Sequence, residues 1–150
     1  MKYLTIAIAL ILFSTCSSDD STKDYTTEND LEIQEYIADN NLTAQKSNSG
    51  LYYVIDTTGT GEQPINTDNV TVAYKGYFTN GTTFDQSNEN GISFNLQQVI
   101  SGWTEGITYF KEGGNGILLI PSSLGYGNAG RGSIPGGAVL IFDINLISVN

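Results

Sequence analysis

The chain of 150 residues contains no histidine, and this absence removes whole classes of chemistry. No other side chain titrates unperturbed near neutral pH, so histidine-dependent triads and histidine general bases are excluded. Most common zinc and haem sites need imidazole and are excluded for the same reason. Cys16 is the only cysteine, so no disulfide can form within the chain. Acid-base and nucleophilic catalysis are therefore disfavoured, and no cofactor or metal is expected.

Positive charge is also scarce. The chain has 6 Lys and Arg against 16 Asp and Glu, which gives a formal net charge of -10 at pH 7. Phosphate backbones and anionic lipid surfaces repel such a chain, so a nucleic-acid partner is not expected. The composition is 39% hydrophobic and 11% aromatic, which is typical of a chain that folds around a packed core.

The chain has one long apolar run, at its N-terminal end. Lys2 precedes the apolar stretch from Tyr3 to Phe13, which is shorter than the roughly 20 residues of a membrane-spanning helix and is typical of a secretory signal. A buried helix is the alternative. Cys16 follows directly after Ser14 and Thr15, and this junction resembles a bacterial lipoprotein box, in which the cysteine sulfur is acylated. We predict a signal peptide over residues 1–15 and lipid attachment at Cys16.

This anchor is expected to be the only tie to a membrane and to place the protein in the bacterial cell envelope, at the outer membrane. The sequence Ser17-Ser18-Asp19-Asp20 resembles an acidic signal that sends some bacterial lipoproteins to the cell surface. A solvated linker is the alternative. The periplasmic face and the cell surface therefore both stay open.

The segment that follows divides into a tether and a small helix. Residues 16–29 are rich in Ser, Thr, Asp and Glu, so the acylated cysteine is expected to begin a polar tether. Residues 30–49 are predicted to form a short helix, over 30–40, and a linker. Its apolar side chains recur at i, i+3 and i+4 and are Ile33, Tyr36 and Ile37. Asn29 is available as the N-cap residue, and Asn40-Asn41 as a stop signal.

Residues 50–150 are predicted to form a β domain, because all 17 glycines lie there and the apolar period changes to two. Two runs alternate as half-buried antiparallel strands do. Their apolar positions are Val70, Val72, Tyr74 and Phe78 in the first run, and Leu140, Phe142, Ile144 and Leu146 in the second. Asn80-Gly81 reads as a hairpin turn. Further strands are predicted over 51–56, 92–96 and 117–120.

A short helix is predicted over residues 101–110, where Trp103, Ile107 and Phe110 share one face. The expected fold class is α+β, a curved antiparallel β-sheet wrapped around this helix.

Five motifs occur along this domain in a fixed order. They are Val72-Ala73-Tyr74-Lys75-Gly76, Thr83-Phe84-Asp85-Gln86-Ser87, Val99-Ile100-Ser101-Gly102-Trp103-Thr104-Glu105-Gly106, Ile120-Pro121 with Leu124-Gly125-Tyr126-Gly127, and Ile134-Pro135 with Leu140-Ile141-Phe142-Asp143. Together they resemble the FKBP-type peptidyl-prolyl cis-trans isomerases over residues 50–150. The family fold is a five- or six-stranded antiparallel sheet around a short helix, in agreement with the pattern above.

The resemblance implies an apolar pocket that binds proline-containing segments of client proteins, and a macrolide is an expected ligand. Trp103 would form its floor. The walls would be Tyr74, Phe84, Val99, Ile100, Ile134 and Phe142, with Ile92 at a position that is often aromatic in the family. Asp85 and the Tyr126 hydroxyl would lie at the rim, and the backbone N–H of Ile100 would donate to a substrate carbonyl. Asp85, Tyr126, Trp103 and Ile100 are thus the expected catalytic residues.

The resemblance implies isomerisation of Xaa-Pro bonds, and together with the predicted signal it suggests a role in the folding of exported proteins. A monomer is expected, because the domain is small and has no evident dimerisation segment. The chain departs from the family at Asp85, because residues 87–90 lack the arginine that pairs with this aspartate in many members. A non-catalytic chaperone that binds proline segments, or an accessory subunit of an envelope machine, is the alternative. Arg131 either reaches toward a ligand or is simply solvated.

Overall fold

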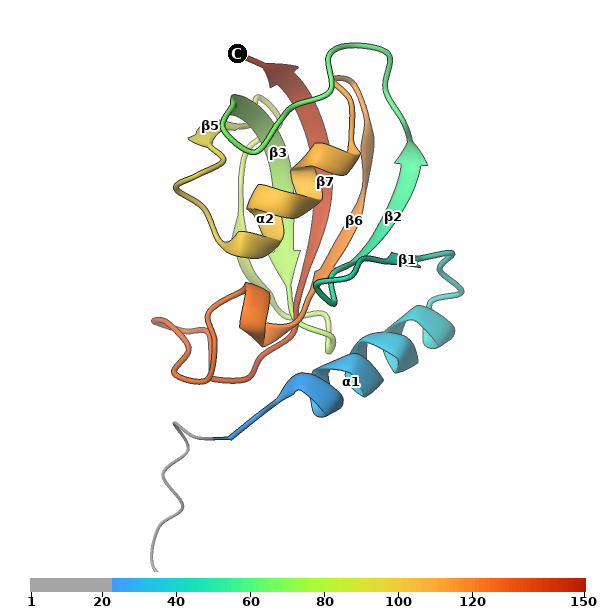
Figure 1. Ribbon diagram of the computed structural model, residues 1–150, viewed down its shortest axis with the longest axis vertical. Helices are drawn as coiled ribbons and strands as arrows, with labels where there is room; N and C mark the ends of the chain where they lie inside the picture. The colour runs from blue at the N-terminus through green and yellow to red at the C-terminus, as the bar shows by residue number, and fades with distance from the viewer. Residues whose placement is uncertain (1–22) are drawn as a thin grey trace, which may run out of the picture.

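The computed structural model describes residues 23–150, which form one antiparallel sheet that curves around a short helix (Figure 1). The elements in chain order are α1 (Thr26–Asp39), β1 (Gln45–Lys46), β2 (Tyr52–Thr57), β3 (Asn69–Tyr77), β4 (Thr83–Gln86), β5 (Ile92–Asn95), α2 (Ser101–Gly106), β6 (Asn115–Ile120) and β7 (Leu140–Val149). Two 3₁₀ turns lie at Ile107–Tyr109 and Ser122–Leu124. The predicted signal peptide, Cys16 and the tether up to residue 22 lie outside the described residues.

The strands follow the order β1-β2-β6-β7-β3-β4, and β5 also pairs with β3. The central pairing joins β3 and β7, from Val70 opposite Val149 to Tyr77 opposite Ile141. The outer edge of β3 is shared, because β5 pairs with its first half and β4 with its second half. The predicted α+β class and curved antiparallel sheet are confirmed. The described sheet has seven strands instead of five or six, and β1 contributes only two residues to it.

Helix α2 packs closely on the concave face of the sheet, as Figure 1 shows. Its inner side chain, Trp103, is 4% exposed, and Ile107 and Phe110 in the turn that follows are fully buried. The predicted helix over 101–110 is therefore present, but its second half is a 3₁₀ turn. A Cβ at Gly102 would lie 2.6 Å from a side-chain carbon of Ile120, so only glycine lets the helix come this close to β6.

The N-terminal helix differs from the prediction. Helix α1 begins at Thr26, four residues before the expected start, and its N-cap residue is Tyr25. The prediction that Asn29 caps the helix is therefore wrong. Asn29 lies in the first turn, is 2% exposed, and bonds to groups far along the chain instead of to the helix start. Residues 26–29, predicted to belong to the polar tether, are therefore part of helix α1, and tertiary contacts hold Asn29 there.

Helix α1 covers part of the sheet face opposite α2. Ile33 is fully buried in a cluster on that face, together with Tyr52, Val54, Leu119, Val139 and Ile141. Asp30 accepts hydrogen bonds from the Lys46 ammonium and, at 2.8 Å, from the Tyr52 hydroxyl. These two bonds hold the pKa of the Asp30 carboxyl below its ordinary value. The helix is thus fixed to β1 and β2 by both apolar and polar contacts.

Residues 23–150 contain neither a membrane-spanning helix nor a metal-binding group of side chains. Neither helix combines the length and the apolar composition that a bilayer crossing requires. No three His, Cys, Asp or Glu side chains gather into a group able to hold a metal ion.

Candidate functional site

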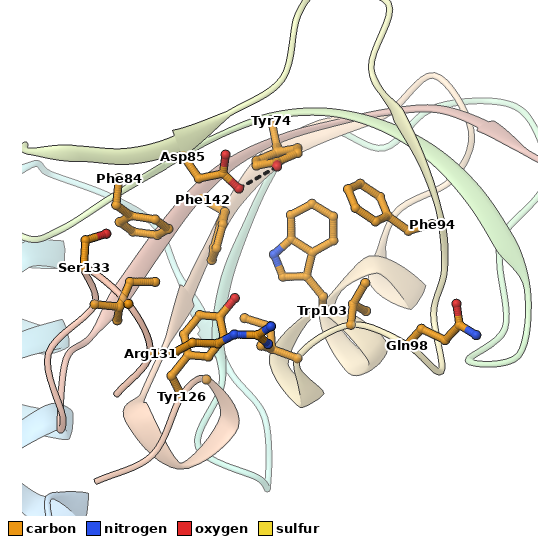
Figure 2. Close-up of a pocket in the computed structure, with 15 residues that line it drawn as sticks. Tyr74, Phe84, Asp85, Phe94, Gln98, Trp103, Tyr126, Arg131, Ser133 and Phe142 are labelled. Carbon is orange, nitrogen blue, oxygen red and sulfur yellow. Dashed lines mark hydrogen bonds between the residues drawn. The ribbon is translucent and has the colours of Figure 1, made fainter. Parts of the chain in front are cut away.

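A cleft of about 760 Å³ opens between α2, the β3–β4 hairpin and the loop that joins β6 to β7 (Figure 2). Its lining residues are Tyr74, Phe84, Asp85, Phe94, Gln98, Val99, Ile100, Trp103, Gly125, Tyr126, Arg131, Gly132, Ser133, Ile134 and Phe142. These residues come from segments separated by up to about half of the chain, and the curvature of the sheet brings them together.

The indole of Trp103 lies in the centre of the cleft in Figure 2, with three aromatic rings around it. The ring centroids of Tyr74, Phe94 and Phe142 lie 5.1, 5.4 and 5.3 Å from that of Trp103, each in an edge-on arrangement. Such edge-to-face contacts are favourable because the positive ring edge meets the negative ring face. The Trp103 Nε1 is buried and makes no hydrogen bond within residues 23–150. The floor of the cleft is therefore rigid and dominated by aromatic rings.

The far wall is formed by Phe84 and Phe142. Their ring centroids lie 5.5 Å apart, again edge-on. Phe84 belongs to β4 and Phe142 to β7, and both flank Gly76 on the strand between them. A Cβ at Gly76 would lie 2.7 Å from atoms of both rings. Glycine at this position therefore makes room for the aromatic wall.

Asp85 lies at the rim and is held by a tyrosine. The Tyr74 hydroxyl donates a hydrogen bond to its Oδ2 at 2.7 Å. Burial, and next the hydrogen bond to Asp85, raise the pKa of Tyr74, so its hydroxyl stays a neutral donor at physiological pH. Neither of the two ion pairs within residues 23–150 involves Asp85. Within the described residues, a tyrosine hydroxyl, and no ion pair, thus orients the Asp85 carboxylate.

Ile100 lies just before α2 with an extended backbone, at φ -60° and ψ 149°. Its carbonyl accepts the backbone N–H groups of Trp103 and Thr104, at 2.9 and 3.1 Å. Its own N–H donates no hydrogen bond to any described residue. The backbone N–H of Ile100, which lies beside the aromatic floor, is therefore available to donate a hydrogen bond to the carbonyl group of a bound peptide.

The loop between β6 and β7 supplies the remaining wall. The backbones of Arg131 and Ile134 exchange two hydrogen bonds of 2.9 Å each, which makes a tight turn at the mouth of the cleft. Both side chains line the cleft, and Arg131 is also exposed. Figure 2 shows the Arg131 side chain overlapping Tyr126 at the near side of the opening. Arg131 is the only arginine in the chain, so it brings the one guanidinium to this site.

Every residue expected in the pocket lines this cleft except Ile92. The expected place of Ile92 in the wall is wrong, because its side chain is 44% exposed and Phe94 contacts Trp103 instead. The register of β5 causes this: Ile92 lies opposite Val72, and Phe94 lies opposite Val70.

Three lining side chains were missed from the sequence: Phe94, Gln98 and Ser133. Period-two alternation places Phe94 on the same strand face as Ile92, so the sequence offers both as wall residues and does not choose between them.

Comparison with known proteins agrees with this geometry. Residues 60–147 match the family model described as FKBP-type peptidyl-prolyl cis-trans isomerase. The FKBP-type peptidyl-prolyl cis-trans isomerase FkpA of Aeromonas hydrophila is 43% identical over 126 residues, which cover 81% of this chain and 47% of that protein. FkpA of Escherichia coli strain K12 is 45% identical over 105 residues, 69% of this chain and 39% of that protein. The chain thus spans less than half the length of these curated relatives.

Solved structures show the same fold. The crystal structure of Escherichia coli FkpA aligns with a TM-score of 0.74 and 38% identity, covering 83% of this chain and 61% of that one. A peptidyl-prolyl cis-trans isomerase from Pseudomonas syringae pv. tomato aligns with a TM-score of 0.72 and 32% identity, over 86% of this chain and 98% of that one. The chain belongs to the family of FKBP-type peptidyl-prolyl cis-trans isomerases.

Proposed function

We propose that this protein catalyses the cis-trans isomerisation of Xaa-Pro bonds in other proteins. The observation that carries the proposal is the aromatic cleft, in which ring edges surround Trp103, the Ile100 N–H lies beside this floor, and Asp85 and Tyr126 lie at the rim. The similarity to relatives such as the FKBP-type peptidyl-prolyl cis-trans isomerase FkpA of Aeromonas hydrophila supports the same activity.

The chemistry needs no proton transfer by a side chain. Rotation about a peptide bond is opposed by a barrier of about 18–20 kcal/mol, because the twisted amide loses its resonance. The apolar cleft would hold the proline ring on Trp103 and disfavour the more polar planar amide. Hydrogen bonds that fit only the twisted geometry would then stabilise the transition state selectively. Each tenfold gain in rate requires about 1.4 kcal/mol, so a few such contacts are sufficient.

Each residue has a proposed role. Trp103 is the floor for the proline ring, and Tyr74, Phe84, Val99, Ile134 and Phe142 enclose it, with Phe94 in place of Ile92. The Ile100 N–H donates to the substrate carbonyl. The Asp85 carboxylate and the Tyr126 hydroxyl act at the rim, where the carbonyl of the rotating bond changes direction.

The decisive measurement is exchange between cis and trans forms of a panel of Xaa-Pro peptides, followed by NMR with the full-length protein. We expect acceleration that the macrolide rapamycin blocks. Trp103→Ala and Asp85→Leu should each reduce kcat/KM at least about tenfold, equivalent to about 1.4 kcal/mol. Asp56→Leu is the matched control, because Asp56 is an exposed acid on β2 outside the cleft. A folded wild-type protein that accelerates no peptide would contradict the proposal.

A non-catalytic protein that binds proline segments is the second candidate. It is favoured by the absence of an ion-pair partner for Asp85 within the described residues. The same experiment separates the two, because peptide binding seen as shifts of cleft resonances, without faster exchange, would identify a binding protein.

We further propose that the protein acts on exported clients in the cell envelope, attached to the outer membrane through lipid on Cys16, as a monomer. The support is the sequence: the apolar run after Lys2, the cysteine at its end, and a polar segment that would separate the domain from the membrane.

A further inference from the structure

Asn29 in α1 has a buried side chain whose oxygen and nitrogen each make a hydrogen bond. It is 2% exposed, and among residues 23–150 only Ser122 joins it as a buried polar residue. The Asn29 Oδ1 accepts the backbone N–H of Ser122 at 2.8 Å, and its Nδ2 donates to the carbonyl of Gly137 at 2.8 Å. Ser122 lies at the start of the loop between β6 and β7, and Gly137 lies at its end. One side chain from the N-terminal helix therefore joins both ends of the loop that lines the cleft.

These bonds continue into the loop and close a ring. The N–H of Gly137 donates to the carbonyl of Gly127 at 2.9 Å. The N–H of Gly127 in turn donates to the carbonyl of Ser122 at 2.8 Å. The ring thus runs through Asn29, Gly137, Gly127 and Ser122, and Gly127 directly follows Tyr126. The backbone that carries the Tyr126 hydroxyl is fixed by a residue that lies outside the cleft.

The loop needs such support because of its composition. Residues 121–137 contain six glycines, and four of them have positive φ, namely Gly127, Gly130, Gly132 and Gly137. Glycine loses more conformational freedom on ordering than any other residue, so the loop depends on contacts from outside it.

The start of α1 supplies further contacts of this kind. A Cβ at Gly137 would lie 2.3 Å from the Tyr25 ring, so glycine is required where that ring packs. The Asn128 side chain also donates to the carbonyl of Lys23. Figure 1 shows the N-terminal end of α1 beneath this loop.

We propose that Asn29 is a positioning residue for the isomerase: it links helix α1 to the loop so that Tyr126, Arg131 and Ile134 face the cleft. The inference rests on the proposed function, because it assigns the held loop to peptide binding. It assigns α1 a role in activity, in addition to covering the sheet.

The test compares three variants of the full-length protein by kcat, KM and amide hydrogen exchange, at a temperature where each is folded by circular dichroism. Asn29→Ala removes both bonds. Asn29→Asp keeps an acceptor for Ser122 but loses the donor to Gly137. Ile33→Ala is the control, because Ile33 lies one turn further along α1, is fully buried, and belongs to the cluster on the sheet face opposite α2. It weakens helix docking without touching the ring.

We expect Asn29→Ala to raise KM and to lower kcat/KM by at least about tenfold, because a misplacement of about 1 Å can cost as much as about a hundredfold. Exchange of the Gly127 and Gly137 amides should accelerate in the same variant, and also in Asn29→Asp, whose carboxylate oxygen would meet the Gly137 carbonyl with no donor between them. Ile33→Ala should leave kcat and KM close to wild type, because the ring of bonds is intact in the folded protein; its amide exchange should rise across the α1–sheet contact as a whole, since the variant is less stable.

Folded Asn29→Ala with unchanged kinetics and unchanged exchange overturns the proposal. An equal loss of kcat/KM in folded Ile33→Ala overturns it as well. If Asn29→Ala does not fold, Asn29→Asp decides by the same criteria. If the wild type isomerises no peptide, the proposed function fails, and exchange at Gly127 and Gly137 still decides whether Asn29 holds the loop.

Discussion

Phe94 and Ile92 show how single strand positions decide which side chain meets a ligand. Both lie on β5, two residues apart, and the sequence alone offers either as the wall of the cleft. Only Phe94 lines the cleft, with its ring edge-on to Trp103. Because the register of β5 on β3 is set by backbone pairing over the whole strand, the choice between them is a tertiary one.

This difference can be tested with a matched pair of variants. Phe94→Ala should reduce kcat/KM by at least about tenfold, because burial of an aromatic side chain against the proline ring contributes about 1.5–3 kcal/mol and each tenfold corresponds to about 1.4 kcal/mol. Ile92→Ala should leave kcat/KM close to wild type, since its side chain is 44% exposed and outside the cleft. The measurement is peptide exchange by NMR for both proteins. A larger loss in Ile92→Ala would show that the wall is assigned to the wrong residue.

Helix α1 illustrates how an element is stabilised by one face only. Its buried face includes Ile33, which is 0% exposed, whereas Leu31 on the same helix is 63% exposed. Few isolated helices of this length are stable in water, so its stability here comes mainly from packing on the sheet.

The two positions should respond very differently to truncation. Ile33→Ala should lower the free energy of unfolding by about 2–4 kcal/mol, through lost burial and the cavity that remains. Leu31→Ala should change it by less than about 0.5 kcal/mol, because an exposed side chain loses little on truncation. Urea denaturation followed by circular dichroism measures both. Equal effects would mean that α1 does not dock on the sheet through Ile33.

At the scale of the whole molecule, the proposed anchor joins a folded domain to a membrane through a polar segment. The acidic chain, at -10, is not attracted to anionic lipid surfaces, so attachment would depend on the acyl chains at Cys16.

Cys16→Ala should therefore move the protein from the membrane fraction to the soluble fraction of cells that process lipoproteins. Ser18→Ala, two residues away, is the control and should remain with the membrane. Cell fractionation with mass spectrometry of the N-terminal peptide measures both location and acyl mass. A Cys16→Ala protein that stays with the membrane would refute the anchor.

Much of the fold and of the cleft follows from the sequence by itself. Period-two alternation determined which faces of β3 and β7 are buried, since adjacent side chains of a strand point to opposite sides. The order of the five motifs identified the family and most of the cleft, including Trp103, Asp85 and Tyr126. These features depend on residue type and local spacing, which a sequence states directly.

Only the tertiary structure decided the remaining features. It placed Phe94 instead of Ile92 in the wall and gave Asp85 a tyrosine as its partner. It also showed that Asn29, the expected helix cap, links α1 to the loop between β6 and β7. Each of these depends on which groups from distant parts of the chain meet. Strand register and side-chain hydrogen bonds over long separations are fixed by packing of the whole domain, and no local pattern specifies them.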